Sequence, residues 1–472
     1  MFRRNLSIQV VLAVILIVFA AVVGRLERMR SEIDAANSAS DLALREMADR
    51  ADTGGRSPEL IVRFKPGVAP LQMREAASRL NDRIADRIES VNGLAVIDDL
   101  DDADPSAAAA EYAAMSDIVE YAEPNTEISL SDPEPGLGPG SDEPSASDDG
   151  PNDPQFAEQW ALNNLGLNGG KRGVDVRAID AWRATQGSHD VVVAVLDSGV
   201  DYTHVDLKEN MWVRPEGLPA YQDEELGIVN DLNGFASARL DADPMDENGH
   251  GTHCAGIIGA EGDNGEGIAG INWHVRIMPL KFMGRGGFGD TATAIEAINY
   301  AIDRKKNGVN VRVISASWGS TLRSQALEDA IRAAGDAGIL FVAAAGNDGS
   351  NNDRSPHYPS SYDLPNVISV AAIDRTGELA SFSNFGGRTV HIAAPGKDIL
   401  STWLNDSYRN ASGTSMATPY VAGVAALLSA HRPKMTASEL KQRLIESVER
   451  SSSLDGKVIS GGRLDAARAL AR

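Results

Sequence analysis

The chain has 472 residues, more than one ordinary domain needs, so two or three domains are expected. Its 67 acidic residues outnumber 44 basic ones and give a formal net charge of −23. This balance argues against binding to nucleic acid or anionic lipid, and it suits either cation binding or a solvated acidic surface. The single cysteine, Cys254, excludes an intramolecular disulfide, so stability must come from the core, from bound ions or from both.

The N-terminal 30 residues combine a basic start with an unbroken apolar run from Val10 to Val23. This pattern predicts an export signal. A membrane anchor formed by residues 6–23 is the alternative, because the run approaches the ~18 residues of a marginal membrane span and no clear signal-cleavage site follows. Residues 31–56 are small, polar and charged, and we expect them to form a tether.

Residues 57–130 are patterned as a small α+β domain. Runs rich in apolar and β-branched residues predict strands, and apolar residues at helical spacing predict helices. The strands are expected at residues 60–65, 94–97 and 118–122, and the helices at 69–80 and 106–114.

An acidic linker follows at residues 131–151. From Ser131 to Pro154 the chain holds six prolines, four glycines and seven acidic residues, and Leu137 is the only large apolar side chain. Such a segment cannot bury enough apolar surface to offset the entropy of ordering. We expect it to be disordered and open to cleavage.

From Pro154 onward strands and helices alternate, which predicts a doubly wound α/β domain with a mostly parallel sheet flanked by helices. The strands are expected at residues 191–196, 310–315, 339–345, 367–372 and 390–394, and the helices at 290–306, 324–337 and 415–431. In such sheets active sites collect at the carboxyl ends of strands, where Asp197 and Asn347 lie.

Three short segments each place one reactive side chain at the edge of a regular element. They are Val193–Gly199 with Asp197, Asn248–Gly256 with His250, and Ser412–Pro419 with Ser415. A serine hydroxyl becomes a nucleophile when a histidine takes its proton, and that imidazole needs a carboxylate to hold its tautomer. In this chain order the segments resemble those of the subtilisin-like serine proteases. The presence of Cys254 in the histidine segment makes that segment similar to those of the thermitase and proteinase K branches.

The resemblance implies a subtilisin-like catalytic domain at residues 152–472, with Ser415 as nucleophile, His250 as base and Asp197 as the orienting carboxylate. It also implies that the Asn347 side chain and the Ser415 backbone N–H stabilise the oxyanion. The residues that match the family's substrate-binding strand are Ser317, Trp318 and Gly319.

Three further residues lie in or near the motifs of the family but are not predicted to act in catalysis. His253 is expected to be a structural neighbour of the base, because His-x-x-His without a helical carboxylate partner is a weak metal signal. Cys254 is expected to be a packing residue and not a nucleophile. His357 falls near the wall of the family's S1 pocket, and we make no prediction of substrate preference from it.

Residues 61–65 and 118–125 resemble parts of the inhibitory propeptide of this family. The resemblance implies a ferredoxin-like propeptide domain at residues 57–130 and a maturation site in the linker at residues 131–151. On pattern alone, an unrelated small domain is the alternative.

A structural calcium ion is implied by the thermitase-like pattern, in which Asp153, Asp206 and Asn264 match ligand positions. Three solvated loop residues are the alternative interpretation. Residues 241–246 suggest a second calcium site as readily as an acidic surface loop. No organic cofactor is expected.

Taken together, these features predict an exported, monomeric serine endopeptidase, extracellular or in the cell envelope, that is made as a self-processing zymogen. Its partners would be polypeptide substrates and its own propeptide. The alternatives are a scaffold protein without turnover and an esterase, although no Gly-x-Ser-x-Gly elbow is present.

Overall fold

The computed structural model describes residues 59–101, 103–130, 134–135, 150–223, 227–237 and 243–471. All of them belong to one compact unit, residues 53–472. The predicted export signal or anchor, the predicted tether and most of the predicted linker lie outside the described residues. Within the described residues, no helix is both long enough and apolar enough to cross a membrane.

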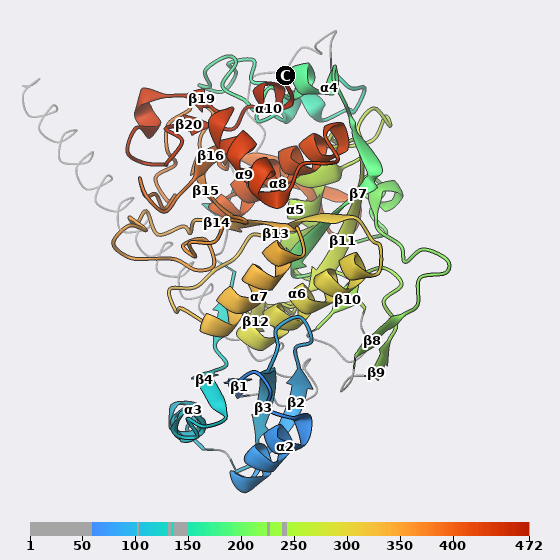
Figure 1. Cartoon of the computed structure of the whole chain (residues 1–472). Coiled ribbons are helices and arrows are strands. Elements are labelled where there is room, and N and C mark those ends of the chain that lie inside the picture. The colour runs from blue at the N-terminus through green and yellow to red at the C-terminus, as the bar shows by residue number, and fades with distance from the viewer. Residues whose placement is uncertain are drawn as a thin grey trace, which may run out of the picture. The chain divides into compact units, whose positions relative to one another are not determined.

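The N-terminal domain is an antiparallel sheet in the order β2-β3-β1-β4 with two helices on one face (Figure 1). The helix-covered face buries Leu60, Val62 and Phe64 against Ala76 and Tyr112. The elements are β1 (Leu60–Phe64), α2 (Pro70–Arg79), β2 (Asp82–Arg87), β3 (Leu94–Asp99), α3 (Pro105–Ala114) and β4 (Val119–Pro124).

Strand β2 is absent from the sequence prediction, because in Asp82–Arg87 only Ile84 and Ala85 are apolar. The predicted alternation of three strands with two helices is therefore wrong by one strand. The observed order, βαββαβ, is that of the ferredoxin-like fold, so the predicted fold class of this domain is confirmed.

The larger domain is built on a nine-stranded sheet in the order β10-β11-β7-β13-β14-β15-β16-β20-β19. Neighbouring strands are parallel except β19 and β20 at one edge, which confirms the predicted doubly wound sheet. The strands are β7 (Gly187–Asp197), β10 (Phe235–Ala236), β11 (His274–Lys281), β13 (Val311–Ala316), β14 (Leu340–Ala344), β15 (Val367–Ile373), β16 (Ile392–Pro395), β19 (Glu449–Arg450) and β20 (Gly462–Arg463).

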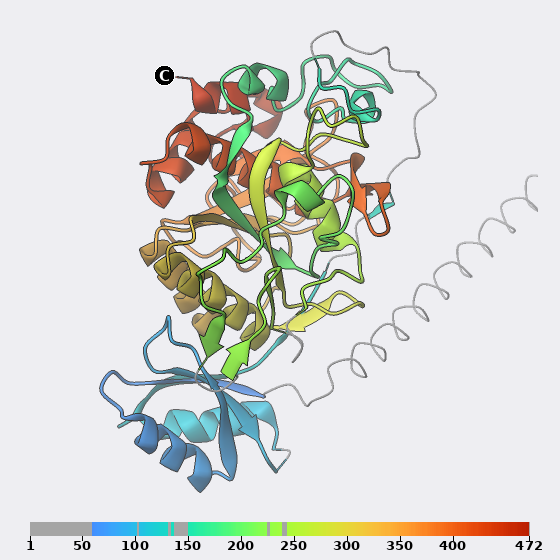
Figure 2. The same cartoon turned by 90° about the vertical axis from the view of Figure 1, so that its right-hand side faces the viewer.

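Helices cover both faces of this sheet (Figures 1 and 2). Val193 and Val195 of β7 pack against one layer, whereas Ala194 and Leu196 pack against the other. Because both faces are buried there, residues 191–196 of the strand are continuously apolar. The first layer contains α4 (Ala178–Trp182), α5 (His250–Gly259), α8 (Thr414–His431), α9 (Ala437–Glu446) and α10 (Ala466–Leu470), and the second contains α6 (Thr291–Lys306) and α7 (Gln325–Asp336).

Shorter strands lie around this framework. They are β5 (Glu127–Ser129), β6 (Glu134–Pro135), β8 (Tyr221–Asp223), β9 (Gly227–Val229), β12 (Phe288–Asp290), β17 (Ile399–Trp403) and β18 (Ser407–Ser412).

The uncovered face of the N-terminal sheet packs against α6 and α7 (Figure 1). Ile61, Leu94 and Val96 join the apolar cluster that includes both helices. At the edge of this contact, the Tyr121 hydroxyl donates to Asp329 Oδ2 of α7 at 2.8 Å. The two domains therefore share a continuous apolar interface with a polar rim.

Candidate active site

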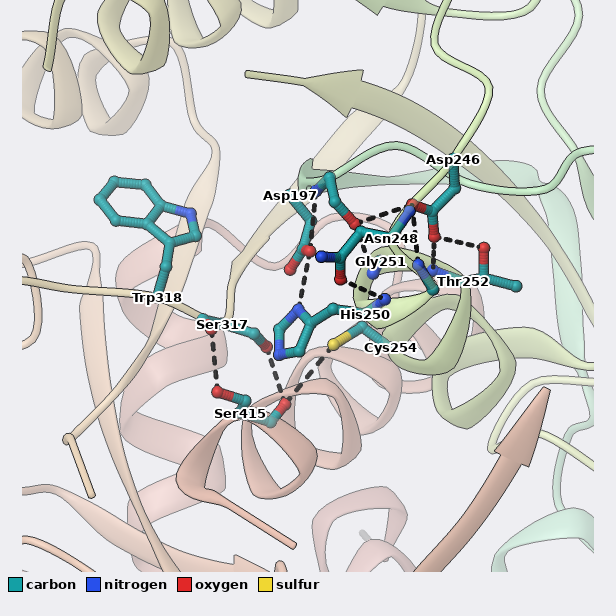
Figure 3. A network of polar contacts seen from close by, with 12 residues as sticks. Asp197, Asp246, Asn248, His250, Gly251, Thr252, Cys254, Ser317, Trp318 and Ser415 are labelled. Atoms are coloured by element: carbon teal, nitrogen blue, oxygen red, sulfur yellow. Dashed lines mark hydrogen bonds and ion pairs between the residues drawn. The ribbon is translucent and has the colours of Figure 1, made fainter. Parts of the chain in front are cut away.

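Asp197 and His250 form a buried pair at the carboxyl end of the central strand β7. His250 Nδ1 lies 2.7 Å from Asp197 Oδ1, and the two residues are 2% and 1% exposed (Figure 3). An imidazole whose Nδ1 donates to a carboxylate presents its Nε2 as an acceptor. The pair can therefore take a proton from a nearby hydroxyl.

The helix that carries His250 is anchored by Asp246, which the sequence did not single out as part of the active site. The first residue before α5 is Gly249, at φ 104°, and glycine has no side chain to cap the helix. Asp246 supplies the acceptors instead: its Oδ1 accepts from the backbone N–H groups of Asn248 and Gly249, and its Oδ2 accepts from that of Thr252. The signal available in the sequence was an aspartate four residues before the first residue of an apolar helix.

Ser415 is the second residue of α8 and lies beside this pair (Figure 3). Its hydroxyl donates to the carbonyl oxygen of Ser317 at 2.9 Å, and its own carbonyl oxygen accepts from the Ser317 hydroxyl at 2.8 Å. A backbone N–H in the first turn of a helix has no acceptor within the helix. The Ser415 amide is thus available at the positive end of the α8 dipole.

Asn347 follows β14 and contacts the start of α8. Its Oδ1 accepts from the Thr414 backbone N–H at 2.8 Å and from the Thr414 hydroxyl at 2.9 Å. These two donors assign the oxygen to the Thr414 side, so Nδ2 is the atom left to donate elsewhere. The structure thus brings the amide of Asn347 to the same helix end as Ser415.

His253 and Cys254 are buried behind the pair. His253 Nε2 contacts the carbonyl oxygens of Ile399 and Arg409 at 3.1 and 3.0 Å, and burial lowers the pKa of His253 to about 3. Cys254 Sγ lies 3.6 Å from the Ser415 carbonyl oxygen, and burial raises the pKa of this thiol well above its usual range. Both side chains are therefore neutral parts of the packing around the site.

The three candidate substrate-binding residues differ in whether their side chain or only their backbone is available to a substrate. Ser317 contacts Ser415 directly, and Gly319 forms an antiparallel bridge with Ser129 of the N-terminal segment. The Trp318 side chain lies in the core, since its indole N–H donates to the Leu196 carbonyl oxygen and the residue is 2% exposed. Only the backbone of Trp318 can therefore contact a substrate.

Strand β5, from the end of the N-terminal domain, lies in a groove between β12 and residues 317–319. Strand β5 pairs with β12 on one side, and its last residue bridges Gly319 on the other. The Leu130 backbone N–H then donates to the Gly287 carbonyl oxygen at 3.0 Å. Further along the chain, the backbone of β6 pairs with Ala411 and Ser412 of β18, just before Ser415.

His357 fills the space between two glycines of the groove. A Cβ atom on Gly319 would lie 2.2 Å from His357 Cε1, and one on Gly346 would lie 3.0 Å from Cδ2. The ring is buried, and burial lowers the pKa of His357. A neutral imidazole thus closes one wall of the site next to Asn347.

The candidate calcium ligands Asp153, Asp206 and Asn264 lie together. Asn264 Nδ2 donates to Asp206 Oδ1 at 2.9 Å, and Asp153 Oδ2 accepts from the Asp263 backbone N–H at 2.8 Å. Both carboxylates are buried, and neither is paired with a lysine or arginine among the described residues. Burial, with the nearby charge of Asp153, raises the pKa of Asp206 to about 6. Two buried carboxylates without a cationic side chain fit a hard cation.

The second candidate calcium region is only partly described, since residues 241–242 lie outside the described residues. Both carboxylate oxygens of Asp246, the last residue of this region, accept hydrogen bonds from backbone N–H groups at the start of α5.

A buried Asp–His pair facing a serine at a helix start defines a serine hydrolase of the doubly wound α/β type. Residues 188–461 match the subtilase family, peptidase S8, and residues 56–125 match the fervidolysin N-terminal prodomain. The chain therefore belongs to the subtilase family and is a serine endopeptidase with an N-terminal prodomain.

Individual relatives agree with the thermitase-like branch. The chain is 37% identical over 316 residues to a thermophilic serine proteinase of Bacillus sp. strain AK1, covering 67% of this chain and 70% of that protein. It is 34% identical over 321 residues to thermitase of Thermoactinomyces vulgaris, covering 68% and 99%. It is 36% identical over 309 residues to a cell wall-associated protease of Bacillus subtilis, covering 65% and 31%.

Proposed function

We propose that this endopeptidase cleaves peptide bonds through an acyl-enzyme intermediate, with Ser415 as nucleophile, His250 as base and Asp197 as the orienting carboxylate. The observation that carries the proposal is the 2.7 Å contact between His250 Nδ1 and Asp197 Oδ1, buried beside the start of α8. Before attack, the Ser415 hydroxyl must turn from the Ser317 carbonyl toward His250, because it has only one proton to donate.

The proton of Ser415 then passes to His250 as Oγ bonds to the scissile carbonyl carbon, and Asp197 stabilises the imidazolium. The imidazolium returns the proton to the leaving amine, and a water molecule repeats the sequence on the acyl-enzyme. The Ser415 amide and Asn347 Nδ2 hold the charge on the carbonyl oxygen. Asn347→Ala should lower kcat by ~10²–10³ with little change in KM, a magnitude known from a subtilisin, a member of the same family.

The same site would process its own precursor. Strand β5 ends at the bridge between Ser129 and Gly319, and β6 pairs with Ser412, three residues before Ser415. Only four residues of the chain separate these two pairings beside the nucleophile, which supports cleavage of a bond between Leu130 and Glu134. Until β5 leaves the groove, it occupies the place of a substrate strand.

Calcium and export complete the proposal. A calcium ion bound by Asp153 and Asp206 would neutralise their buried charges, and Asn264 and nearby backbone carbonyls would supply further oxygens. Residues 1–30 would direct export of a monomeric precursor, in keeping with their basic start and apolar run.

The test is the intact mass of wild type and of Ser415→Ala after folding in calcium. We expect wild type to release an N-terminal fragment that ends between Leu130 and Glu134, and Ser415→Ala to stay whole. If both folded proteins stay whole, self-processing is refuted. If both are cut alike, another protease does the processing, and hydrolysis of a peptide substrate by wild type but not by Ser415→Ala then decides the role of Ser415.

A further inference from the structure

Three carboxylates from distant parts of the chain meet at the interface between the N-terminal domain and the catalytic domain. They are Asp86 of β2, Asp223 of β8 and Glu296 of α6, and one oxygen of each lies within 4.8 Å of the others. The residues are 8%, 2% and 5% exposed. The site is therefore closed off from solvent by both domains, and β8 lies beside the N-terminal domain there (Figure 2).

A bulge in β2 aims Asp86 at this interface. The pairing of β2 with β3 shifts register between Ile84 and Asp86, so that Ile84 pairs with Ile97 and Asp86 pairs with Val96. Ile97 lies in the cluster under the helices of the N-terminal domain, whereas Val96 lies in the cluster shared with the catalytic domain. Without the extra residue, Asp86 would face the same side as Ile84.

Two of the three carboxylates lack a cationic partner among the described residues, since neither Asp86 nor Glu296 is paired with a lysine or arginine. Glu296 Oε1 accepts from the Tyr221 hydroxyl at 3.1 Å, whereas Oε2 is buried and has no hydrogen-bond donor among the described residues. An orphaned carboxylate oxygen at such depth is costly unless a proton or a cation meets it.

The carboxyl groups of Asp86 and Glu296 lie within hydrogen-bonding reach of each other. Two carboxylates make that contact only when a proton or a cation lies between them. Burial, together with the charge of Asp223, raises the pKa of Asp86 to about 7, and burial raises the pKa of Glu296 well above its usual range. The site therefore strongly favours a positive charge at neutral pH.

We infer that a divalent cation of calcium's size binds between Asp86, Asp223 and Glu296 and joins the N-terminal domain to the catalytic domain. All the ligand atoms at this site would be carboxylate oxygens, which suits a hard cation. Calcium binds oxygens at about 2.3–2.6 Å, so two ligands of one ion can be at most about 5 Å apart, and the three oxygens meet this limit. This site is separate from that of Asp153 and Asp206, which belong to the catalytic domain alone.

The consequence is a cation that only the precursor, or the complex with the bound N-terminal domain, can hold. Removal of the N-terminal domain takes Asp86 away and leaves Asp223 and Glu296 exposed to solvent. The ion would therefore strengthen the hold of the N-terminal domain on the enzyme, and loss of that domain would release it.

The test counts calcium ions bound per chain after equilibrium dialysis at neutral pH, in the full chain with Ser415→Ala, which cannot process itself. We expect Glu296→Gln and Asp86→Asn, each added to that chain, to bind one ion fewer. Asp117→Asn, which neutralises an exposed carboxylate of the same domain, is the matched control and should bind the full number. An unchanged count in both site variants would overturn the inference and assign a shared proton to the site.

A second comparison avoids substitution of buried residues. Catalytic domain freed of its N-terminal domain, by its own activity or by an added protease, should bind one ion fewer than the Ser415→Ala full chain. Equal counts would overturn the inference. Ions at Asp153 and Asp206 cancel in this comparison, and the Ser415→Ala measurements do not depend on proteolytic activity, so failure of the proposed mechanism would be seen separately.

Discussion

The carboxylate of Glu123 is predicted to hold the N-terminal domain on the enzyme more strongly than any exposed ion pair at the interface. It lies at the end of β4 and accepts from the backbone N–H groups of Gln325 and Ala326, at 3.0 and 3.2 Å, and from the Ser324 hydroxyl. It therefore binds the N-terminus of α7, where unpaired N–H groups and the helix dipole favour a negative charge.

The expected cost of Glu123→Gln follows from these contacts. Hydrogen bonds to a charged group contribute about 1.5–3 kcal/mol, and glutamine keeps one acceptor oxygen while its amide group faces N–H donors. A loss of about 2 kcal/mol corresponds to a roughly 30-fold weaker complex. Because affinity changes act mainly through dissociation, the cleaved N-terminal domain should leave the enzyme correspondingly faster.

The assay is the lag before full peptidase activity after the precursor folds and cuts itself. Glu123→Gln should shorten this lag by about tenfold or more. Glu120→Gln on the same strand is the matched control, since Glu120 is 47% exposed in its ion pair with Arg63 and such pairs contribute about 0–1 kcal/mol. Equal lags in Glu123→Gln and wild type, or an equal effect of Glu120→Gln, would refute the reasoning. Hydrogen exchange of the Gln325 and Ala326 amides in Ser415→Ala chains gives a check that needs no processing.

Three further outcomes are expected. Asp246→Asn should lower the free energy of unfolding by about 1.5–3 kcal/mol, measured by denaturant titration, and should lower kcat more than KM, because Asp246 holds the start of the His250 helix. His357→Gly should raise kcat/KM for peptides with a large apolar residue before the scissile bond by about tenfold or more and leave small residues unaffected; equal gains for both would contradict a pocket-closing role. Since burial lowers the pKa of His253 to about 3, the unfolded state binds a proton below pH 6.5 that the folded state excludes. The contribution of His253 to the free energy of unfolding is therefore complete above pH 6.5 and falls by about 1.4 kcal/mol per pH unit toward pH 3. In denaturant titrations at several pH values, His253→Gln should lack this part of the pH dependence of wild type.

Local patterns in the chain were sufficient for many of the longer elements and for the resemblance. Residues 191–196, just before Asp197, are a continuous apolar run, and α6 is capped by the predicted Asp290, whose side chain accepts from the Thr293 N–H at 2.8 Å. Backbone propensity and capping depend only on neighbours within a few residues, so a local pattern is enough to predict such features.

Besides the shorter strands, two longer strands were missed, each for its own local reason. Strand β2 is mostly charged, and β11 contains Pro279, which argues against a strand inside a sheet. In the folded chain β10 pairs with β11 only at Leu280 and Lys281, so the missing N–H of Pro279 costs no ladder bond on that side. Tertiary pairing decided both strands against their local signals.

The chain by itself determined which residue types could act, and the order of Asp197, His250 and Ser415 indicated the family. Only the tertiary structure decided that the Trp318 side chain is buried, that Asp246 anchors the His250 helix, and that β5 lies in the groove. It also decided the meeting of Asp86, Asp223 and Glu296. The physical reason is that contacts between distant segments follow from the packing of whole layers, which no window of local sequence contains.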